Sequence, residues 1–164
     1  MMLLELESQT VRAKIAPLPD AFLRRVREEG RDDLGQPVRR LRAKGGEPCR
    51  DALRRAKPGE EIILASFSPF TVAGPFHEFG PVYVFANEVP RHEDEELPVG
   101  GADDYLREQF VIRAYSKEED ILDAALVQAP AAQAKIDALL GRADVAFLHV
   151  RFPTYGCFAC RIDR

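Results

Sequence analysis

The chain has 164 residues and a mass of 18.4 kDa, the size of one domain, so we expect a single domain over 1–164. Hydrophobic residues make up 46% and charged residues 30%, which excludes long disordered, collagen-like and coiled-coil chains. Three cysteines exclude a disulfide-stapled mini-protein, and a net charge of −4 gives no overall attraction to nucleic acid or anionic membrane.

The first third of the chain is predicted to contain one strand and two helices. Residues 9–15 alternate apolar and polar side chains, which indicates a strand with one buried face. Residues 19–28 carry apolar residues at helical spacing after a proline, which favours a helix. Residues 48–57 show the same pattern and are followed by Pro58-Gly59, so they are predicted to form a second, short helix. The polar segment 30–46 between them is predicted to be a flexible loop.

Strands dominate the rest of the prediction. A capping-box pattern at 116–119 predicts a helical turn, and 130–140 predicts a helix that ends at Gly141. Residues 144–152 and 156–163 are predicted to pair as a C-terminal hairpin. The remaining predicted strands are 61–67, 81–86, 110–115 and 122–128.

Helices and strands alternate without a regular βαβ pattern. We therefore predict the α+β class, as one compact domain with a largely antiparallel sheet, a few packed helices and a C-terminal β-hairpin. The acidic segment 88–104 contains prolines and glycines and is predicted to be a second flexible surface loop.

Basic residues are concentrated between positions 24 and 57. This segment carries a net charge of +6, so the rest of the chain carries −10. It contains no aromatic residue on which a base could stack, and charge runs are usually solvated. We therefore expect a solvated basic face and do not favour a nucleic-acid partner.

The chain start has no targeting pattern, since Met1 to Leu4 is too short an apolar run for a signal peptide. No stretch approaches the ~20 apolar residues of a membrane helix. We expect a soluble cytoplasmic protein that makes no membrane contact and keeps its cysteines reduced.

The C-terminal hairpin is predicted to bring site residues together. A register that keeps both apolar sets on one face places Arg151 opposite Cys157 and His149 opposite Ala159. A neighbouring arginine and imidazole would stabilise a thiolate, and a Cys–His pair is a minimal nucleophile design. Alternatively, Cys157 is a small buried residue and His149 a satisfied core histidine.

Cys157 and Cys160 form a C-x-x-C pattern, but in a strand they would point to opposite faces about 10 Å apart. Redox and zinc motifs need both sulfurs on one side, and no second C-x-x-C is present. We therefore assign Cys160 to the core and predict no metal site for this motif.

Cys49 opens the predicted helix 48–57, where backbone N–H groups and Arg50 would favour a thiolate. Its phase with the apolar residues of that helix favours simple packing instead. If the fold united them, Cys49, Cys157 and His149 could hold zinc, or the two cysteines could form a disulfide.

Further polar residues are candidates for ligand contact. Arg113 shares a strand face with Tyr115 and could hold an anion, or form a structural ion pair. His77 lies in a turn before a strand and is either an acid or base at a site rim or an exposed loop histidine. The sequence shows no phosphate-binding glycine loop, no H-E-x-x-H, no G-x-S-x-G and no serine triad.

Four segments carry distinctive motifs: Pro48-Cys49-Arg50-x-x-Leu53-x-x-Ala56-x-x-Gly59-Glu60, Gly80-Pro81-Val82-Tyr83-Val84, Arg113-Ala114-Tyr115, and Val145-Ala146-Phe147-Leu148-His149-Val150 leading to Gly156-Cys157-Phe158. Together they resemble a bacterial family known as a domain of unknown function, DUF1203, over nearly the whole chain. The resemblance implies one compact domain in a soluble protein and no particular activity or cofactor. It directs attention to Cys49, Arg50, His149 and Cys157.

Two functional hypotheses remain open. In the first, a pocket binds a small anionic molecule, and a thiolate acts as nucleophile or metal ligand while a histidine transfers protons. In the second, a non-catalytic module binds a small anion or a partner, and the cysteines are structural. The sequence does not decide whether the protein is an enzyme, nor its cofactor or oligomeric state. The candidate catalytic residues are Cys49, His149 and Cys157, and the candidate ligand-binding residues are Arg50, Arg113 and Arg151.

Overall fold

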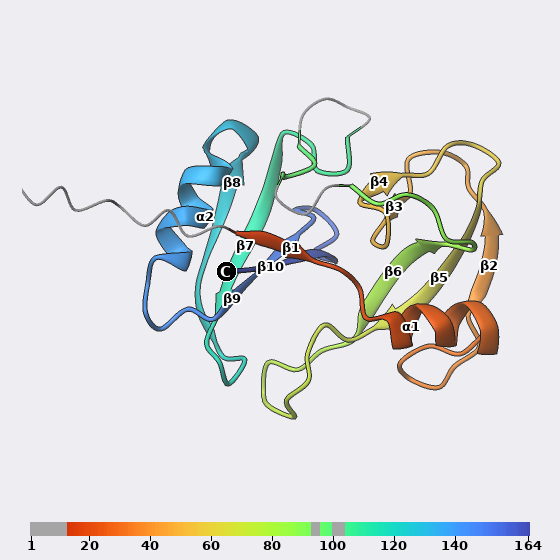
Figure 1. Ribbon diagram of the computed structural model, residues 1–164, viewed down its shortest axis with the longest axis horizontal. Coiled ribbons are helices and arrows are strands. Elements are labelled where there is room, and N and C mark those ends of the chain that lie inside the picture. The colour runs from red at the N-terminus through yellow and green to blue at the C-terminus, as the bar shows by residue number, and fades with distance from the viewer. Residues whose placement is uncertain (1–12, 93–95, 100–103) are drawn as a thin grey trace, which may run out of the picture.

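In the computed structural model, which describes residues 13–92, 96–99 and 104–164, two five-stranded sheets lie side by side (Figure 1). Neighbouring strands in the first sheet are all antiparallel, in the order β1 (Lys14–Ala16), β10 (Phe158–Asp163), β9 (Phe147–Arg151), β7 (Gln109–Tyr115) and β8 (Ile121–Gln128). The second sheet has the order β2 (Arg39–Arg42), β5 (Glu61–Phe67), β6 (Gly80–Phe85), β3 (Pro48–Cys49) and β4 (Arg54–Arg55), and only β3 and β6 are parallel.

Two helical segments cover these sheets. Helix α1 (Asp20–Arg24) continues into a π-helical turn, η1 (Arg25–Glu29), and packs on the second sheet through Phe22 and Val26. Helix α2 (Ala132–Leu140) follows a 3-10 turn, η2 (Ala129–Ala131), and lies on the outer side of the first sheet (Figure 1). The α+β class, the predominance of antiparallel pairs and the C-terminal hairpin are confirmed, with the strands divided between two sheets.

The apolar residues form a core on each sheet and a junction between the two. The larger core lies between the first sheet and α2, where Ile112, Leu148 and Ile136 are almost fully buried. The junction core joins α1 and β5–β6 to Phe158 of the first sheet. Phe158 therefore ties the C-terminal strand to the second sheet.

The prediction of a helix over 48–57 is wrong. One helical bond forms there, from the N–H of Leu53 to the carbonyl of Cys49, with an N···O distance of 2.9 Å. Leu53 then adopts a left-handed backbone conformation with φ of 55°, which reverses the chain into β4. The buried face was foreseen, because Cys49 and Ala56 are both buried, but a strand–turn–strand presents it.

The loop predicted over 30–46 contains strand β2, so this prediction is also wrong in part. All four residues of β2 are exposed, and the strand pairs with β5 through the register from Arg39–Leu64 to Arg42–Glu61. An edge strand without a buried face lacks the alternation that identifies strands in a sequence.

The capping-box turn predicted at 116–119 is a β-hairpin turn between β7 and β8. The N–H of Ser116 donates to the carbonyl of Asp120, and Glu119 has a left-handed φ of 68°. The Glu119 side chain turns away from Ser116 and accepts the N–H groups of Thr71 and Val72. A tertiary contact thus replaces the local capping bond.

The register of the C-terminal hairpin differs from the prediction because of a β-bulge between Phe158 and Cys160. Arg151 lies opposite Phe158, and His149 lies opposite Arg161. Cys157 belongs to the hairpin loop, where its carbonyl accepts the N–H of Phe152 at 3.0 Å.

The bulge also redistributes side chains between the two faces. Ala159 and Cys160 both enter the larger core, as expected for Cys160, whereas Phe158 turns to the junction core. The carbonyl of Ala159 accepts the buried hydroxyl of Tyr105 at 2.5 Å, so the bulged backbone is satisfied.

The remaining strand and helix predictions agree with the structure where it describes them. Residues 9–12 of the first predicted strand and 93–95 and 100–103 of the predicted loop 88–104 lie outside the described residues. Within the described residues, no helix combines the length and apolar character needed to cross a bilayer.

Candidate functional site

A cavity of about 290 Å³ lies where the two sheets meet. Its walls come from the linker between β1 and α1, the end of β5 with the loop that follows it, and strand β10. The residues that line it are Ala16, Pro17, Leu18, Pro19, Arg50, Leu53, Phe67, Ser68, Pro69, Phe70, Thr71, Phe158, Ala159, Cys160, Arg161 and Asp163.

Arg50 reaches this cavity from the turn that follows β3. Its side chain is buried, with only 5% of the residue exposed. Nε donates to the carbonyl of Phe158 at 2.8 Å and Nη1 donates to the carbonyl of Pro48 at 2.6 Å, while the guanidinium lies 5.0 Å from the ring centroid of Phe152. Arg50 therefore joins the two sheets and leaves Nη2 donors beyond these bonds.

Arg161 and Asp163 reach the cavity from β10. Nε of Arg161 donates to the Asp163 carboxylate at 2.8 Å, and its guanidinium stacks 3.9 Å from the ring centroid of Phe147. The remaining guanidinium donors of Arg161 are not used by this pair. With Arg50, the charged lining sums to +1 in a cavity whose other walls are mostly apolar.

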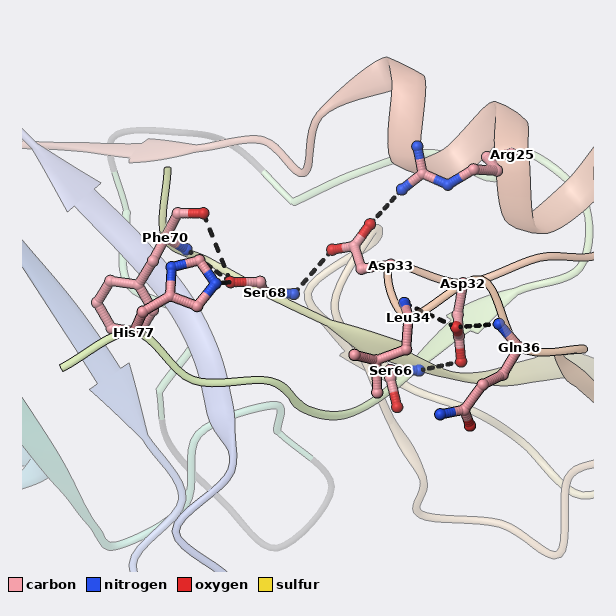
Figure 2. Close-up of polar contacts among 9 residues, drawn as sticks. All are labelled: Arg25, Asp32, Asp33, Leu34, Gln36, Ser66, Ser68, Phe70 and His77. Carbon is pink, nitrogen blue, oxygen red and sulfur yellow. Dashed lines mark hydrogen bonds and ion pairs between the residues drawn. The ribbon is translucent and has the colours of Figure 1, made fainter. Parts of the chain in front are cut away.

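A serine and a histidine lie together in the loop that follows β5 (Figure 2). Ser68 Oγ is 3.1 Å from Nε2 of His77, and Nδ1 of His77 is 2.9 Å from the carbonyl oxygen of Val72. Ser68 is one of the cavity residues, and both side chains are half-buried. His77 stands against the rings of Phe70 and Phe79, with centroids 5.9 and 5.3 Å away.

Two carboxylates hold the loop that carries this pair. The Asp33 carboxylate accepts the N–H of Ser68 at 2.8 Å and pairs with Arg25 of η1 (Figure 2). Three residues further along the loop, the N–H groups of Thr71 and Val72 donate to Glu119, which is 6% exposed. The loop therefore presents Ser68 from fixed backbone rather than from a free connection.

Asp32, next to Asp33, is buried and shapes the turn that places Asp33. Its carboxylate accepts three backbone N–H groups, with N···O distances of 2.9–3.2 Å (Figure 2). Two of them lie in its own turn, at Leu34 and Gln36, and the third is at Ser66 in β5. This carboxylate therefore fixes the turn against the strand that leads to Ser68.

Cys49 lies in the second sheet and faces an apolar cluster that includes Ala52, Ala56 and Phe85. The residue is fully buried, and its thiol donates weakly to the carbonyl of Glu47, with an S···O distance of 3.6 Å. Burial raises the pKa of this thiol to about 12, and the neighbouring Asp51 carboxylate adds to the rise. Such a thiol stays protonated at neutral pH and is a poor nucleophile.

The other two cysteines occupy different surroundings. Burial raises the pKa of Cys160 to about 12. Cys157 is half-exposed in the hairpin loop, with Sγ 3.8 Å from the carbonyl oxygen of Tyr155. All three cysteines are free thiols, so Cys49 and Cys157 form no disulfide. Among the described residues, no three His, Cys, Asp or Glu side chains are grouped to hold a metal ion.

His149 is fully buried in a box of aromatic rings. The rings of Phe70, Tyr115, Phe147 and Phe158 all lie with centroids 4.7–5.1 Å from the imidazole. Neither ring nitrogen has a hydrogen-bond partner in the part of the chain that the structure describes. Burial lowers the pKa of His149 to about 2, with further contributions from nearby arginines.

Arg113 and Arg151 are paired within the protein. Both contact the carboxylate of Glu78, which belongs to the same loop as Ser68, with an Arg113 Nη1 to Glu78 Oε1 distance of 3.4 Å. Arg151 is almost fully buried and Nη1 also donates to the carbonyl of Gly156 at 3.3 Å. This trio anchors the loop on the first sheet.

The structure separates the candidates into four places. Arg50 lines the cavity, and Cys49 is enclosed in the second sheet. His149 with Arg113 and Arg151 lies on one face of the first sheet, and Cys157 lies in the hairpin loop. Sequence reasoning did not identify Ser68, because nothing local to it suggests a partner. The sequence does point to its partner, His77. The contact between the two depends on a turn of the loop, which leaves no periodic pattern in the sequence.

One comparison with known proteins finds a match for this chain. Searches among curated proteins and among solved structures find no match for this chain. A family model described as "Protein of unknown function (DUF1203)" matches residues 46–164, a range that includes Arg50, Ser68, His77 and Arg161 and leaves out α1. The match confirms the resemblance seen in the sequence motifs, and the chain therefore belongs to the DUF1203 family.

Proposed function

We propose that the protein binds a small organic anion with an apolar body in the cavity between its sheets, without using its thiols. The observation that carries this proposal is the pair of arginines, Arg50 and Arg161, that line a cavity whose other walls are mostly apolar and include Phe67 and Phe70. Ligand sites are typically concave, mostly apolar and equipped with a few convergent polar groups.

The size and charge of the cavity restrict the kinds of ligand that it can bind. A volume of about 290 Å³ is at the lower end of the range for small-molecule sites, which favours a compact ligand. The net lining charge of +1 favours one negative charge over two, because Asp163 repels a second. Guanidinium groups bind carboxylates through paired, charge-assisted hydrogen bonds, so a monocarboxylate with an aromatic or aliphatic body fits best.

Thiol chemistry receives less support from the geometry. Cys49 and Cys160 are buried, and the pKa of each is raised rather than lowered. The half-exposed thiol of Cys157 is in the hairpin loop and does not line the cavity. Ligand affinity in a Cys157→Ser variant should therefore equal that of the wild type.

Benzoate is a suitable probe, because it joins one carboxylate to an apolar ring. We expect isothermal titration calorimetry to detect benzoate binding, and the Arg161→Gln variant to weaken it by roughly 10- to 100-fold, the equivalent of one charge-assisted hydrogen bond. Arg24→Gln is the matched control, since Arg24 is an exposed arginine of α1 outside the cavity.

Benzyl alcohol has a similar body without the charge and should bind at least about tenfold more weakly than benzoate. Equal affinities for benzoate and benzyl alcohol would contradict the proposal. So would equal benzoate affinities in the wild type and Arg161→Gln.

A further inference from the structure

The hydrogen bonds of His77 determine which ring nitrogen carries the proton. Nδ1 is 2.9 Å from the carbonyl oxygen of Val72, and a carbonyl can only accept. Nδ1 therefore bears the hydrogen in the neutral imidazole, and Nε2 presents its lone pair to Ser68 Oγ at 3.1 Å. This is the tautomer that a general base needs.

The surroundings of Ser68 Oγ direct its own hydrogen to that lone pair. Oγ accepts the N–H of Phe70 at 3.3 Å, and the carbonyl of Phe70 is more distant, at 3.5 Å. Nε2 of His77 is thus the nearest acceptor for the Ser68 hydroxyl. A nucleophile bonded to a base, with the base oriented by a third group, is the recurring arrangement of nucleophilic catalysis.

Ser68 brings the pair to the proposed binding site. Ser68 is a lining residue of the cavity, and Arg50 and Arg161 line the same cavity. A carboxylate, Asp33, fixes the backbone of Ser68, and Glu119 fixes the loop between Ser68 and His77. Positive charge beside a serine nucleophile stabilises the oxyanion that forms when the serine attacks a carbonyl carbon.

We propose that Ser68 and His77 hydrolyse a small carboxylic ester held in this cavity. This proposal rests on the anion site proposed above and adds a reaction to it. Ser68 Oγ attacks the ester carbonyl carbon while its proton passes to Nε2 of His77. The bond from the carbonyl carbon to the alkoxy oxygen breaks, and His77 returns the proton to the leaving alcohol.

Water completes the cycle. It attacks the acyl-Ser68 ester, and His77 takes one proton from the water and returns it to Oγ as the bond from the acyl carbon to Oγ breaks. The carboxylic acid loses its remaining proton to solvent and leaves as its anion. The product is the class of ligand that the two guanidinium groups favour, since the acid acquires its charge on release.

Covalent labelling of the unaltered protein tests the nucleophile directly. Phenylmethylsulfonyl fluoride carries an apolar ring and a sulfonyl group, and Ser68 Oγ would displace its fluoride while His77 accepts the proton. We expect peptide mass spectrometry to find the benzylsulfonyl group on Ser68 in the native protein. Absence of label at Ser68, or equal labelling of several serines, would overturn the proposal.

Turnover of 4-nitrophenyl acetate tests the base. We expect Ser68→Ala to abolish hydrolysis above the rate of the buffer, and His77→Gln to lower both hydrolysis and labelling roughly 100-fold or more, the usual contribution of a general base. Ser116→Ala, in the β7–β8 turn, is the control and should keep the wild-type rate. Labelling that is as fast in His77→Gln as in the wild type would show that His77 is not the base and would overturn the proposal.

Benzoate titration separates the two proposals. If Ser68→Ala binds benzoate as the wild type does but no labelling occurs in the wild type, the anion site stands and the catalytic proposal fails. If Ser68 is labelled and 4-nitrophenyl acetate is hydrolysed without any benzoate affinity, the catalytic pair stands and the anion site fails.

Discussion

The imidazole of His149 is surrounded by four aromatic rings, with three arginines of the first sheet close enough to disfavour a further positive charge. Its pKa in the folded protein is about 2, against 6.5 as the ordinary value. Because the folded pKa is lowered, His149 contributes stability that is complete above pH 6.5 and is lost as the pH falls towards about 2. Mild acid therefore favours the unfolded chain, in which this residue can take up a proton.

We predict that His149→Phe removes this part of the acid sensitivity. Between about pH 7.5 and about pH 5, the wild type should lose about 2 kcal/mol more unfolding free energy than the variant, from one proton bound only by the unfolded chain. Urea titrations at both pH values measure the difference. Equal losses of unfolding free energy in the two proteins would show that His149 takes up its proton as readily in the folded protein as in the unfolded chain.

The three cysteines should differ in reactivity according to their burial. We predict that iodoacetamide labels Cys157 in the native protein, while Cys49 and Cys160 react only after unfolding, because burial raises the pKa of both thiols. Mass spectrometry of peptides from native and denatured samples gives the answer. Fast native labelling of Cys49 would return thiol catalysis to consideration.

At the scale of the elements, the turn between β3 and β4 works as a clamp between the two sheets. Arg50 leaves this turn and binds the carbonyl of Phe158 at the beginning of β10, and its neighbour Arg55 of β4 donates to the carbonyl of Tyr105 at 3.0 Å. These donors bond one backbone carbonyl of β10 and one of the segment before β7. Short strands with few ladder bonds thus hold their place through side chains.

We predict that Arg50→Met destabilises the fold by about 1.5–3 kcal/mol, since it removes charge-assisted bonds and leaves a buried carbonyl without its donor. Arg142→Met is the matched control, because solvent screens its exposed ion pairs with Asp123 and Asp144, which should contribute little to stability. Chemical denaturation of both variants provides the comparison. Equal losses would mean that the Arg50 bonds are no stronger than surface pairs.

Sequence patterns identified the elements whose own residues alternate or repeat. Strands β5 and β7 and helix α2 were foreseen, because each has a buried face that shows in its spacing. Strand β2 shows no such spacing, since all of it is exposed, and β3–β4 matches a helical pattern because its single helical turn buries the same residues. Tertiary contacts decided these cases.

Less of the candidate site than of the fold could be predicted from the sequence. Arg50 was identified, but the register that predicted Cys157 beside Arg151 failed because of the bulge after Phe158. The Ser68–His77 pair depends on Asp33 and Glu119, which come from other parts of the chain. Single-sequence patterns report periodicity within an element and carry no information on such distant anchors.

At the scale of the whole molecule, the two sheets share a junction and should unfold together. Phe158 belongs to the first sheet yet packs with Phe67 of β5, with ring centroids 5.5 Å apart, and Arg50 bonds across the same boundary. Parts of a protein that share a packed core generally unfold in one cooperative step.

We predict one cooperative transition for both sheets. In native-state hydrogen exchange at increasing denaturant, amides of β5 and β7 should converge on the same free energy of opening. Equal free energies of opening would show that the two sheets unfold as one unit. A lower free energy for β5 alone would show that the second sheet opens independently. Arg50→Met is informative here too, because it should lower both free energies together.

The pairing of β1 with β10 has a consequence for how the protein is made. Lys14 of β1 pairs with Asp163 of β10, so a strand near the start of the chain waits for one near its end. During synthesis, β1, the β9–β10 hairpin and the cavity wall that β10 supplies must remain incomplete until residue 163 has left the ribosome. Non-local pairing of this kind slows folding and leaves strand edges exposed meanwhile. Until β10 has emerged, the nascent chain therefore exposes strand edges that can pair wrongly.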